Sequence, residues 1–127
     1  MKYLLDTHTL IWLLDEPEKL SAKAYSTILD INNTCSVSIA SLWEMVIKAG
    51  LNKLELRVSF SELREQLAVH EIQIFPIYFI HLPTYLGLPL LHKDPFDRMI
   101  IAQALAHNFT IITKDLHFPP YNVPVLW

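Results

Sequence analysis

The chain has 127 residues, of which 52% are apolar and 18% are charged; this allows one domain, predicted to span residues 1–127, and excludes a mainly disordered protein. Its net charge of −3, from 10 basic and 13 acidic residues, excludes a strongly cationic nucleic-acid binder. The single cysteine, Cys35, cannot form a disulfide within the chain, and with a start at Met1 and no signal peptide it favours a reducing cytoplasm.

The apolar content also bears on partners and membranes. A small chain this rich in apolar residues is expected to cover an apolar face with a second copy or with another protein. From Ile72 to His92 the chain carries no Asp, Glu, Lys or Arg, a length that could span a bilayer. Three prolines at positions 76, 83 and 89 would break a helix repeatedly, so we expect no membrane segment there.

The first half of the chain alternates strand and helix patterns. In order, we expect a strand at Lys2–Leu5, a helical turn at Leu10–Leu14, a helix from Ser21 to about Ile31, a strand at Thr34–Val37 and a helix from Ile39 to about Ala49. Ser21 and Ser38 are good N-caps for the two longer helices. Gly50 is the expected C-cap of the second.

The second half continues the alternation. In order, we expect a helix from Ser61 to about Val69, a strand at Ile72–Phe75, irregular or broken helix at Ile77–Leu91, a helix to about Asn108, a strand at Thr110–Thr113 and a candidate fifth strand at Pro124–Trp127. Asp94 and Pro95 open the long helix as N-cap and first residue. This order predicts an α/β fold with a mostly parallel sheet of four to five strands and helices on both faces. In such sheets, sites lie outside the carboxyl ends of the strands.

Four acidic residues stand near that expected edge. Asp6 follows the first strand directly and Asp115 comes two residues after the fourth, although aspartate is common in any loop. Glu44 lies mid-helix among apolar neighbours, where an unpaired charge is costly; alternatively, it faces solvent or pairs with Lys48 at i+4. Asp97 falls in the first turn of the long helix, where an acid also favours the helix dipole.

If these four carboxylates converge, their mutual repulsion needs relief. At a separation of about 6 Å and an effective dielectric constant near 20, each of the pairs costs on the order of 3 kcal/mol. A divalent cation relieves this repulsion, and hard oxygen ligands favour Mg²⁺ or Mn²⁺. A carboxylate-held metal makes bound water more acidic and neutralises charge on a phosphoryl oxygen, so one or two ions would support phosphodiester hydrolysis. Without the four acids the remaining chain has a charge of +1, which need not repel a polyanion.

Four short segments together resemble the PIN domain family, and most closely its VapC-type toxins of bacterial toxin–antitoxin pairs. They are Leu4–His8, Ser41–Glu44, Asp94–Ala104 and Thr113–Asp115, and their order and spacing agree with the family over nearly the whole chain. The resemblance implies a three-layer α/β/α fold, a metal-dependent ribonuclease, homodimers and a cognate antitoxin that inserts near the site.

The same resemblance implies roles for individual residues. The metal-binding and catalytic acids would be Asp6, Glu44, Asp97 and Asp115, of which the last is the least constant position in the family. Thr113 would match the small hydroxyl or amide residue just before the last acid.

Other residues near the acids are candidates for lesser roles. Candidate substrate contacts are Thr7, Arg98, Thr113 and Lys114; the arginine and the lysine could hold RNA phosphates or could balance local charge. His8 and His92 could act as a general base, but capping or loop hydrogen bonds are the favoured interpretation. Trp12 and Trp43 are interpreted as core residues rather than base-stacking platforms.

Other α/β proteins with acids at strand ends fit less well. A phosphate-accepting receiver domain needs a second acid beside the first-strand aspartate, and a dehalogenase-like phosphatase needs an acid two residues after it, where His8 stands. A Rossmann dinucleotide site needs a glycine-rich first turn, but the chain has only Gly50 and Gly87. Taken with the resemblance to VapC-type toxins, the acidic residues lead us to expect a Mg²⁺- or Mn²⁺-dependent endoribonuclease toxin. The alternatives are a PIN-type nuclease that processes RNA in another setting and a non-catalytic protein- or RNA-binding module.

Overall fold

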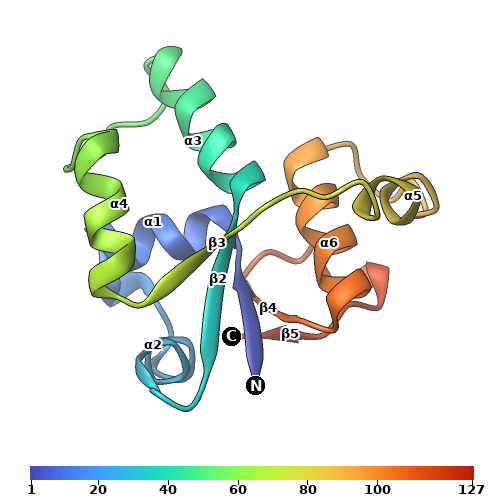
Figure 1. The fold of residues 1–127 in the computed structure, drawn as a ribbon, viewed down its shortest axis with the longest axis horizontal. Coiled ribbons are helices and arrows are strands. Elements are labelled where there is room, and N and C mark those ends of the chain that lie inside the picture. The colour runs from blue at the N-terminus through green and yellow to red at the C-terminus, as the bar shows by residue number, and fades with distance from the viewer.

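A computed structural model describes all residues, 1–127, and is built on a five-stranded parallel sheet. The strands are β1 (Lys2–Leu5), β2 (Thr34–Ser38), β3 (Ile72–Phe75), β4 (Thr110–Ile112) and β5 (Val125–Leu126). Their spatial order is β3-β2-β1-β4-β5, so the first strand is central and the chain crosses over it between β3 and β4 (Figure 1). β1 and β4 are buried along nearly all their length, which is why these short segments consist almost entirely of apolar residues.

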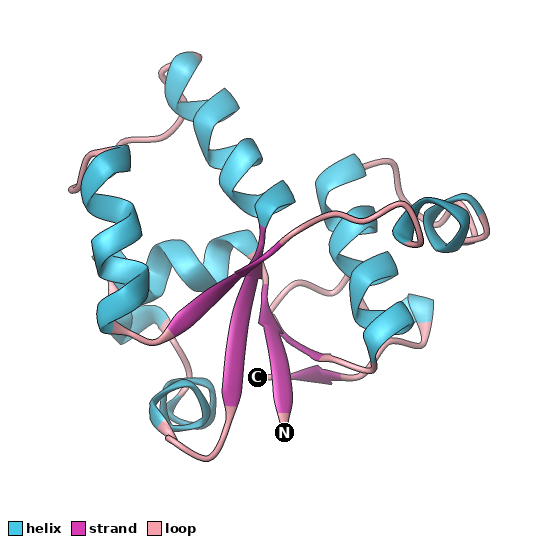
Figure 2. Cartoon of the chain, in the orientation of Figure 1, coloured by secondary structure: helices cyan, strands magenta, loops and turns pink.

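Six helices cover the two faces of the sheet (Figure 2). They are α1 (Thr7–Asp15), α2 (Ala22–Leu29), α3 (Ile39–Gly50), α4 (Phe60–Val69), α5 (His81–Leu86) and α6 (Pro95–His107); the 3-10 turns η1 (Pro17–Lys19) and η2 (Pro119–Tyr121) complete the chain. Residues of α1 to α4 pack with Tyr3 and Leu5 in one core. Leu4, which points to the other face, packs with α6 and η2 in a second core. The predicted three-layer α/β/α fold is therefore confirmed.

The structure corrects the boundaries of three helices. Helix α1 begins at Thr7 rather than Leu10, because the Asp6 carboxylate accepts a hydrogen bond from the Thr9 amide and caps the helix immediately after β1. Helix α4 begins at Phe60, one residue before the predicted start. Gly50 is not the C-cap of α3 but its last helical residue.

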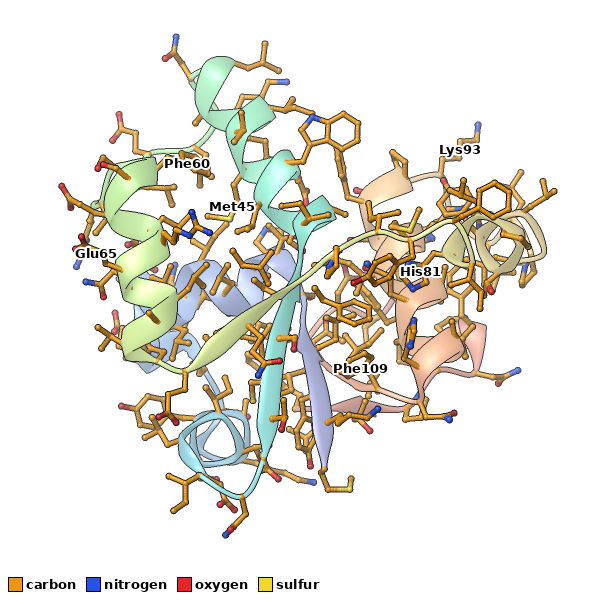
Figure 3. The ribbon with its side chains drawn as sticks, in the orientation of Figure 1. Met45, Phe60, Glu65, His81, Lys93 and Phe109 are labelled. Atoms are coloured by element: carbon orange, nitrogen blue, oxygen red, sulfur yellow. The ribbon has the colours of Figure 1, made fainter.

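Most other local predictions agree with the structure. Ser21, Ser38 and Asp94 are N-caps whose side chains accept backbone hydrogen bonds. The segment from Ile77 to Leu91 contains one short helix, α5, as its irregular pattern predicted. None of the helices is both long and apolar enough to cross a lipid bilayer. Figure 3 shows His81 and Phe109 between the sheet and the α5–α6 side of the molecule.

Candidate active site

The predicted acids are placed by the connections between strands and helices at one edge of the sheet. Strands β1, β2 and β4 run parallel, so their carboxyl ends meet at this edge. Helix α1 starts directly after β1, and α3 starts directly after β2. This arrangement places Asp6 at a helix N-cap and Glu44 in the first half of a helix. The N-terminal turn of α6 contributes Asp97.

Asp6 is 5% exposed, and both of its oxygens accept hydrogen bonds. Oδ1 accepts one from the Thr9 amide at 2.8 Å, and Oδ2 accepts one from the Thr113 hydroxyl. The Thr113 hydroxyl oxygen in turn accepts a bond from the amide of Asp115 at 3.0 Å. Burial raises the pKa of Asp6, against the lowering effect of these two hydrogen bonds. Thr113 thus connects the acid of β1 to the loop after β4.

Glu44 is only 4% exposed, so its charge lies inside rather than on a solvated helix face. Its Oε1 accepts a 2.7 Å hydrogen bond from the Thr7 hydroxyl, and its Oε2 forms a 2.8 Å ion pair with Lys48 Nζ. The predicted i+4 pair is present, and it does not bring the acid to the surface. The buried Glu44 carboxylate is thus held by one hydroxyl and one ammonium group.

Asp97 reports most directly on how the acids are arranged. Burial, and then the negative charges of Asp94, Asp115, Asp6 and Glu44, together raise its pKa from 3.8 to about 8. A carboxylate feels such repulsion only when the other acids lie within a short distance in poorly solvated surroundings. The charges of Asp94, Asp115, Asp6 and Glu44 therefore act on Asp97 from nearby, although these residues are distant from one another in sequence.

Asp115 has a different environment from the other acids. Burial raises its pKa, but hydrogen bonds from His117 outweigh burial and lower it overall. Its Oδ1 accepts one bond from the His117 amide at 2.9 Å and lies 2.8 Å from the Nδ1 atom of the same residue. The hydrogen bonds from His117 therefore favour the ionised form of Asp115.

His92 contacts Asp97, and Tyr121 and His117, which the sequence did not place in the site, contact His92 in turn. His92 Nε2 lies 3.2 Å from Asp97 Oδ2, and His92 Nδ1 lies 2.6 Å from the hydroxyl of Tyr121. The ring of His117 stacks on that of His92 at a centroid distance of 5.1 Å and an angle of 11°. Burial, and then His117, lowers the pKa of His92, which keeps its imidazole neutral. His92 was considered only as a general base or a loop hydrogen-bonding residue, and Tyr121 and His117 belong to no motif.

The candidate substrate contacts divide into buried and exposed residues. Thr7 and Thr113 are buried and hold Glu44 and Asp6, respectively, by hydrogen bonds. Lys114 is exposed beside Asp115.

Two predicted roles disagree with the structure. Arg98 is 6% exposed, and its Nη1 donates to the Pro89 carbonyl at 2.8 Å and to the Tyr121 hydroxyl at 3.1 Å, so it is not placed to hold an RNA phosphate. Trp43 is 60% exposed, although its apolar helix suggested a core position. It packs edge-on against Phe96 of α6 at 5.4 Å between ring centroids.

The donor set fits a hard divalent cation in kind. All four acids offer carboxylate oxygens, and the negative charges of neighbouring acids contribute, after burial, to the raised pKa of Asp97. As the side chains stand, no three His, Cys, Asp or Glu residues are gathered closely enough to enclose an ion. Hydrogen bonds to Thr9, Thr113, Thr7 and Lys48 direct the oxygens of two of the acids toward protein partners instead. The residues thus fit such an ion by chemistry and charge.

Comparisons with known proteins identify the family and support the fold. The PIN domain family pattern matches residues 3–122. Ribonuclease VapC22 of Mycobacterium tuberculosis is 30% identical over 122 residues, which cover 95% of this chain and 92% of the relative. Two crystal structures share the fold. VapBC2 from Rickettsia felis, bound to a DNA fragment from its promoter, has a TM-score of 0.74 and 20% identity, covering 99% of this chain and 98% of that one.

The second structure, VapBC-1 from nontypeable Haemophilus influenzae, has a TM-score of 0.67 and 19% identity, covering 99% of this chain and 97% of that one. At these identities the two structures support the fold, whereas the family pattern and the mycobacterial relative extend along nearly the whole sequence. The chain therefore belongs to the PIN domain family.

Proposed function

We propose that this chain is a Mg²⁺- or Mn²⁺-dependent endoribonuclease, formed by residues 1–127 as one PIN-like domain, and that it is the toxin of a toxin–antitoxin pair. The observation that carries the proposal is the pKa of about 8 at Asp97, which burial and then the charges of nearby acids, among them Asp115, Asp6 and Glu44, raise from 3.8. Membership of the PIN domain family and the ribonuclease name of a relative with 30% identity support the same reaction.

Asp6, Glu44 and Asp97 would hold the metal, and Asp115 would hold it directly or through water. When bound, the ion supplies acidification of water and neutralisation of charge on the phosphoryl group. Thr113 holds Asp6, and Thr7 together with Lys48 holds Glu44, so these side chains fix the carboxylates before an ion arrives. The products are a 5′-phosphate and a 3′-hydroxyl.

RNA binding requires cations that are free to reach phosphates. Lys114 is exposed beside Asp115 and is the better candidate of the two basic residues named from the sequence, because Arg98 is buried. Lys93 is also exposed, two residues before the first turn of α6, and Figure 3 shows it at the surface. Exposed lysines beside an acidic site attract a polyanion by charge without reading its sequence.

Two apolar surfaces support protein partners. A groove of about 440 Å³ between α3 and α4 is lined mainly by apolar side chains, including Trp43, Val46, Phe60 and Leu63. Phe79, in the segment before α5, is 82% exposed, and further large apolar side chains in that segment are exposed. Such surfaces seldom stay uncovered in a soluble monomer. These surfaces support a homodimer and a cognate antitoxin as partners. An RNA substrate and such partners imply a cytoplasmic location.

The test is cleavage of a structured RNA by the wild type and by Asp6→Asn over a Mn²⁺ titration. The wild type should cut the RNA with Mn²⁺ and stop in excess EDTA, and Asp6→Asn should lose at least about two orders of magnitude in rate, as expected for a disrupted metal site. Glu65→Gln is the matched control, since it makes the same chemical change at an exposed residue of α4 (Figure 3). Equal rates for wild type and Asp6→Asn, or full activity in EDTA, would rule out the proposed function.

A further inference from the structure

We propose that Arg98, Tyr121 and His92 form a directional hydrogen-bond chain that positions the Asp97 carboxylate for metal binding, an inference that rests on the proposed function. The chain runs from Arg98 Nη1 to the Tyr121 hydroxyl at 3.1 Å, then to His92 Nδ1 at 2.6 Å, and from His92 Nε2 to Asp97 Oδ2 at 3.2 Å. It starts at the buried Arg98, passes through Tyr121 of the second core and ends at Asp97, whose pKa the nearby acids help to raise.

The direction of the chain follows from counting donors at Tyr121. A hydroxyl oxygen accepts two hydrogen bonds and donates one. Arg98 Nη1 is always a donor, and the backbone N–H of His92 also points at this oxygen, at 3.2 Å. Both lone pairs are therefore occupied, and the hydroxyl hydrogen is left for His92 Nδ1, which must accept it.

The same count of donors determines the tautomer of the His92 imidazole. Because Nδ1 accepts, a neutral His92 carries its hydrogen on Nε2, and this hydrogen points to Asp97 Oδ2. The Oδ2 atom of Asp97 therefore faces an N–H donor of His92 and not an unprotonated ring nitrogen. One carboxylate oxygen is held by the protein, and Oδ1 is the oxygen left for an ion.

Arg98 can anchor the chain because it is itself held from several sides. It donates to the Pro89 carbonyl at 2.8 Å, and its guanidinium lies 5.1 Å from the ring centroid of Tyr85 and 5.9 Å from that of Tyr121. Tyr121 is buried in the second core. Arg98 immediately follows Asp97 on α6 and is buried. It thus acts on Asp97 through Tyr121 and His92, rather than on substrate.

Oriented metal ligands bind more tightly than free ones, because the binding energy is not spent on ordering them. Asp97 needs such support more than its neighbours, since burial and four nearby acids oppose its charge. Asp6 and Glu44 receive theirs from threonine hydroxyls. His92, Tyr121 and Arg98 are positioning residues, because none of them would touch the ion or the scissile phosphate.

The hydrogen-bond direction is tested by ¹⁵N NMR of the metal-free protein at a pH above the imidazole pKa. The expected spectrum shows His92 protonated at Nε2, with an unprotonated Nδ1 whose resonance moves in Tyr121→Phe. Tyr3→Phe is the matched control, because it removes a hydroxyl from another buried tyrosine without touching the chain. A His92 protonated at Nδ1, or an Nδ1 resonance unchanged in Tyr121→Phe, overturns the proposed direction.

The positioning role is tested by calorimetric titration of Mn²⁺ into the same proteins. His92→Leu removes the donor to Asp97 and should weaken Mn²⁺ binding by about 10- to 100-fold. His92→Gln places an amide N–H where Nε2–H stood and should retain most of the affinity. Tyr121→Phe should lose less than His92→Leu, and Tyr3→Phe should bind like the wild type. Urea unfolding of each variant separates this effect from a general loss of stability.

The possible results separate the two proposals. If the wild type binds Mn²⁺, Asp97→Asn does not, and folded His92→Leu binds as tightly as the wild type, the positioning role is wrong and the metal site stands. If His92→Gln is as weak as His92→Leu, the lost donor is not the cause and the role is also wrong. If the wild type binds no Mn²⁺ in the presence or absence of RNA, the proposed function fails and takes the positioning role with it.

Discussion

Replacing Asp97 by asparagine should stabilise the metal-free protein, and the gain should grow with pH. The pKa of this carboxyl is raised from 3.8 to about 8 by burial and by the surrounding acids. A raised carboxyl pKa means that the folded protein holds a proton that the unfolded chain has released. The stability linked to that proton is therefore present at low pH and is lost as the pH rises toward about 8.

The size of the effect follows from proton linkage. Between about pH 5 and about pH 7, folding takes up close to one proton at Asp97, and each pH unit then costs about 1.4 kcal/mol. The wild type should thus lose about 2.7 kcal/mol at this residue over that range. Asp97→Asn cannot titrate, so the free energy of unfolding of the variant minus that of the wild type should rise by a similar amount.

The assay is urea unfolding in EDTA at both pH values, with Glu65→Gln as the matched control on the exposed side of α4. The difference in the free energy of unfolding between variant and wild type cancels the contribution of the histidines that titrate over the same range, because both proteins contain them. The control should show no such growth. Adding Mn²⁺ should restore stability to the wild type, because ion binding favours the charged carboxylate, and should do less for the variant. A difference that is the same at both pH values would refute the convergence of the acids around Asp97.

Three further predictions concern other parts of the fold. Thr113→Val removes the hydroxyl that donates to Asp6 and should lower the free energy of unfolding by about 1–3 kcal/mol in urea, whereas Thr110→Val on β4, which has no such bond, should not. His81 is buried, and burial and then the charge of His107 lower its pKa, so the stability of the fold should decrease as the pH drops below the ordinary histidine pKa. In thermal melts, the melting temperature of His81→Asn should decrease less steeply with acid than that of the wild type. Asp94→Ala removes the cap of α6 and should cost about 1 kcal/mol, whereas an asparagine there, which keeps the capping oxygen, should cost little.

The fold was predictable because its signals are local. Short apolar or β-branched segments predicted four strands and a candidate fifth, all of which the structure contains, and serine or aspartate before a helix predicted three of the N-caps. The errors were also local. Asp6 had been considered only as a site residue, yet its capping bond to Thr9 starts α1 three residues early. Gly50 suggested a left-handed C-cap, but Asn52 is the residue after α3 with a positive φ, 56°.

The sequence by itself determined which acids could act together, because residues after parallel strands and in the first turns of helices share one sheet edge. It also marked a mid-helix glutamate as unusual. Only the tertiary structure decided what each side chain bonds to. Arg98 looked like a surface cation beside an acid, but packing against Tyr85 and Tyr121 turns it inward. Tyr121 and His92 are 29 positions apart, so no spacing rule predicts their hydrogen bond. Such contacts depend on how η2 and the loop before α6 pack together, which a local pattern does not encode.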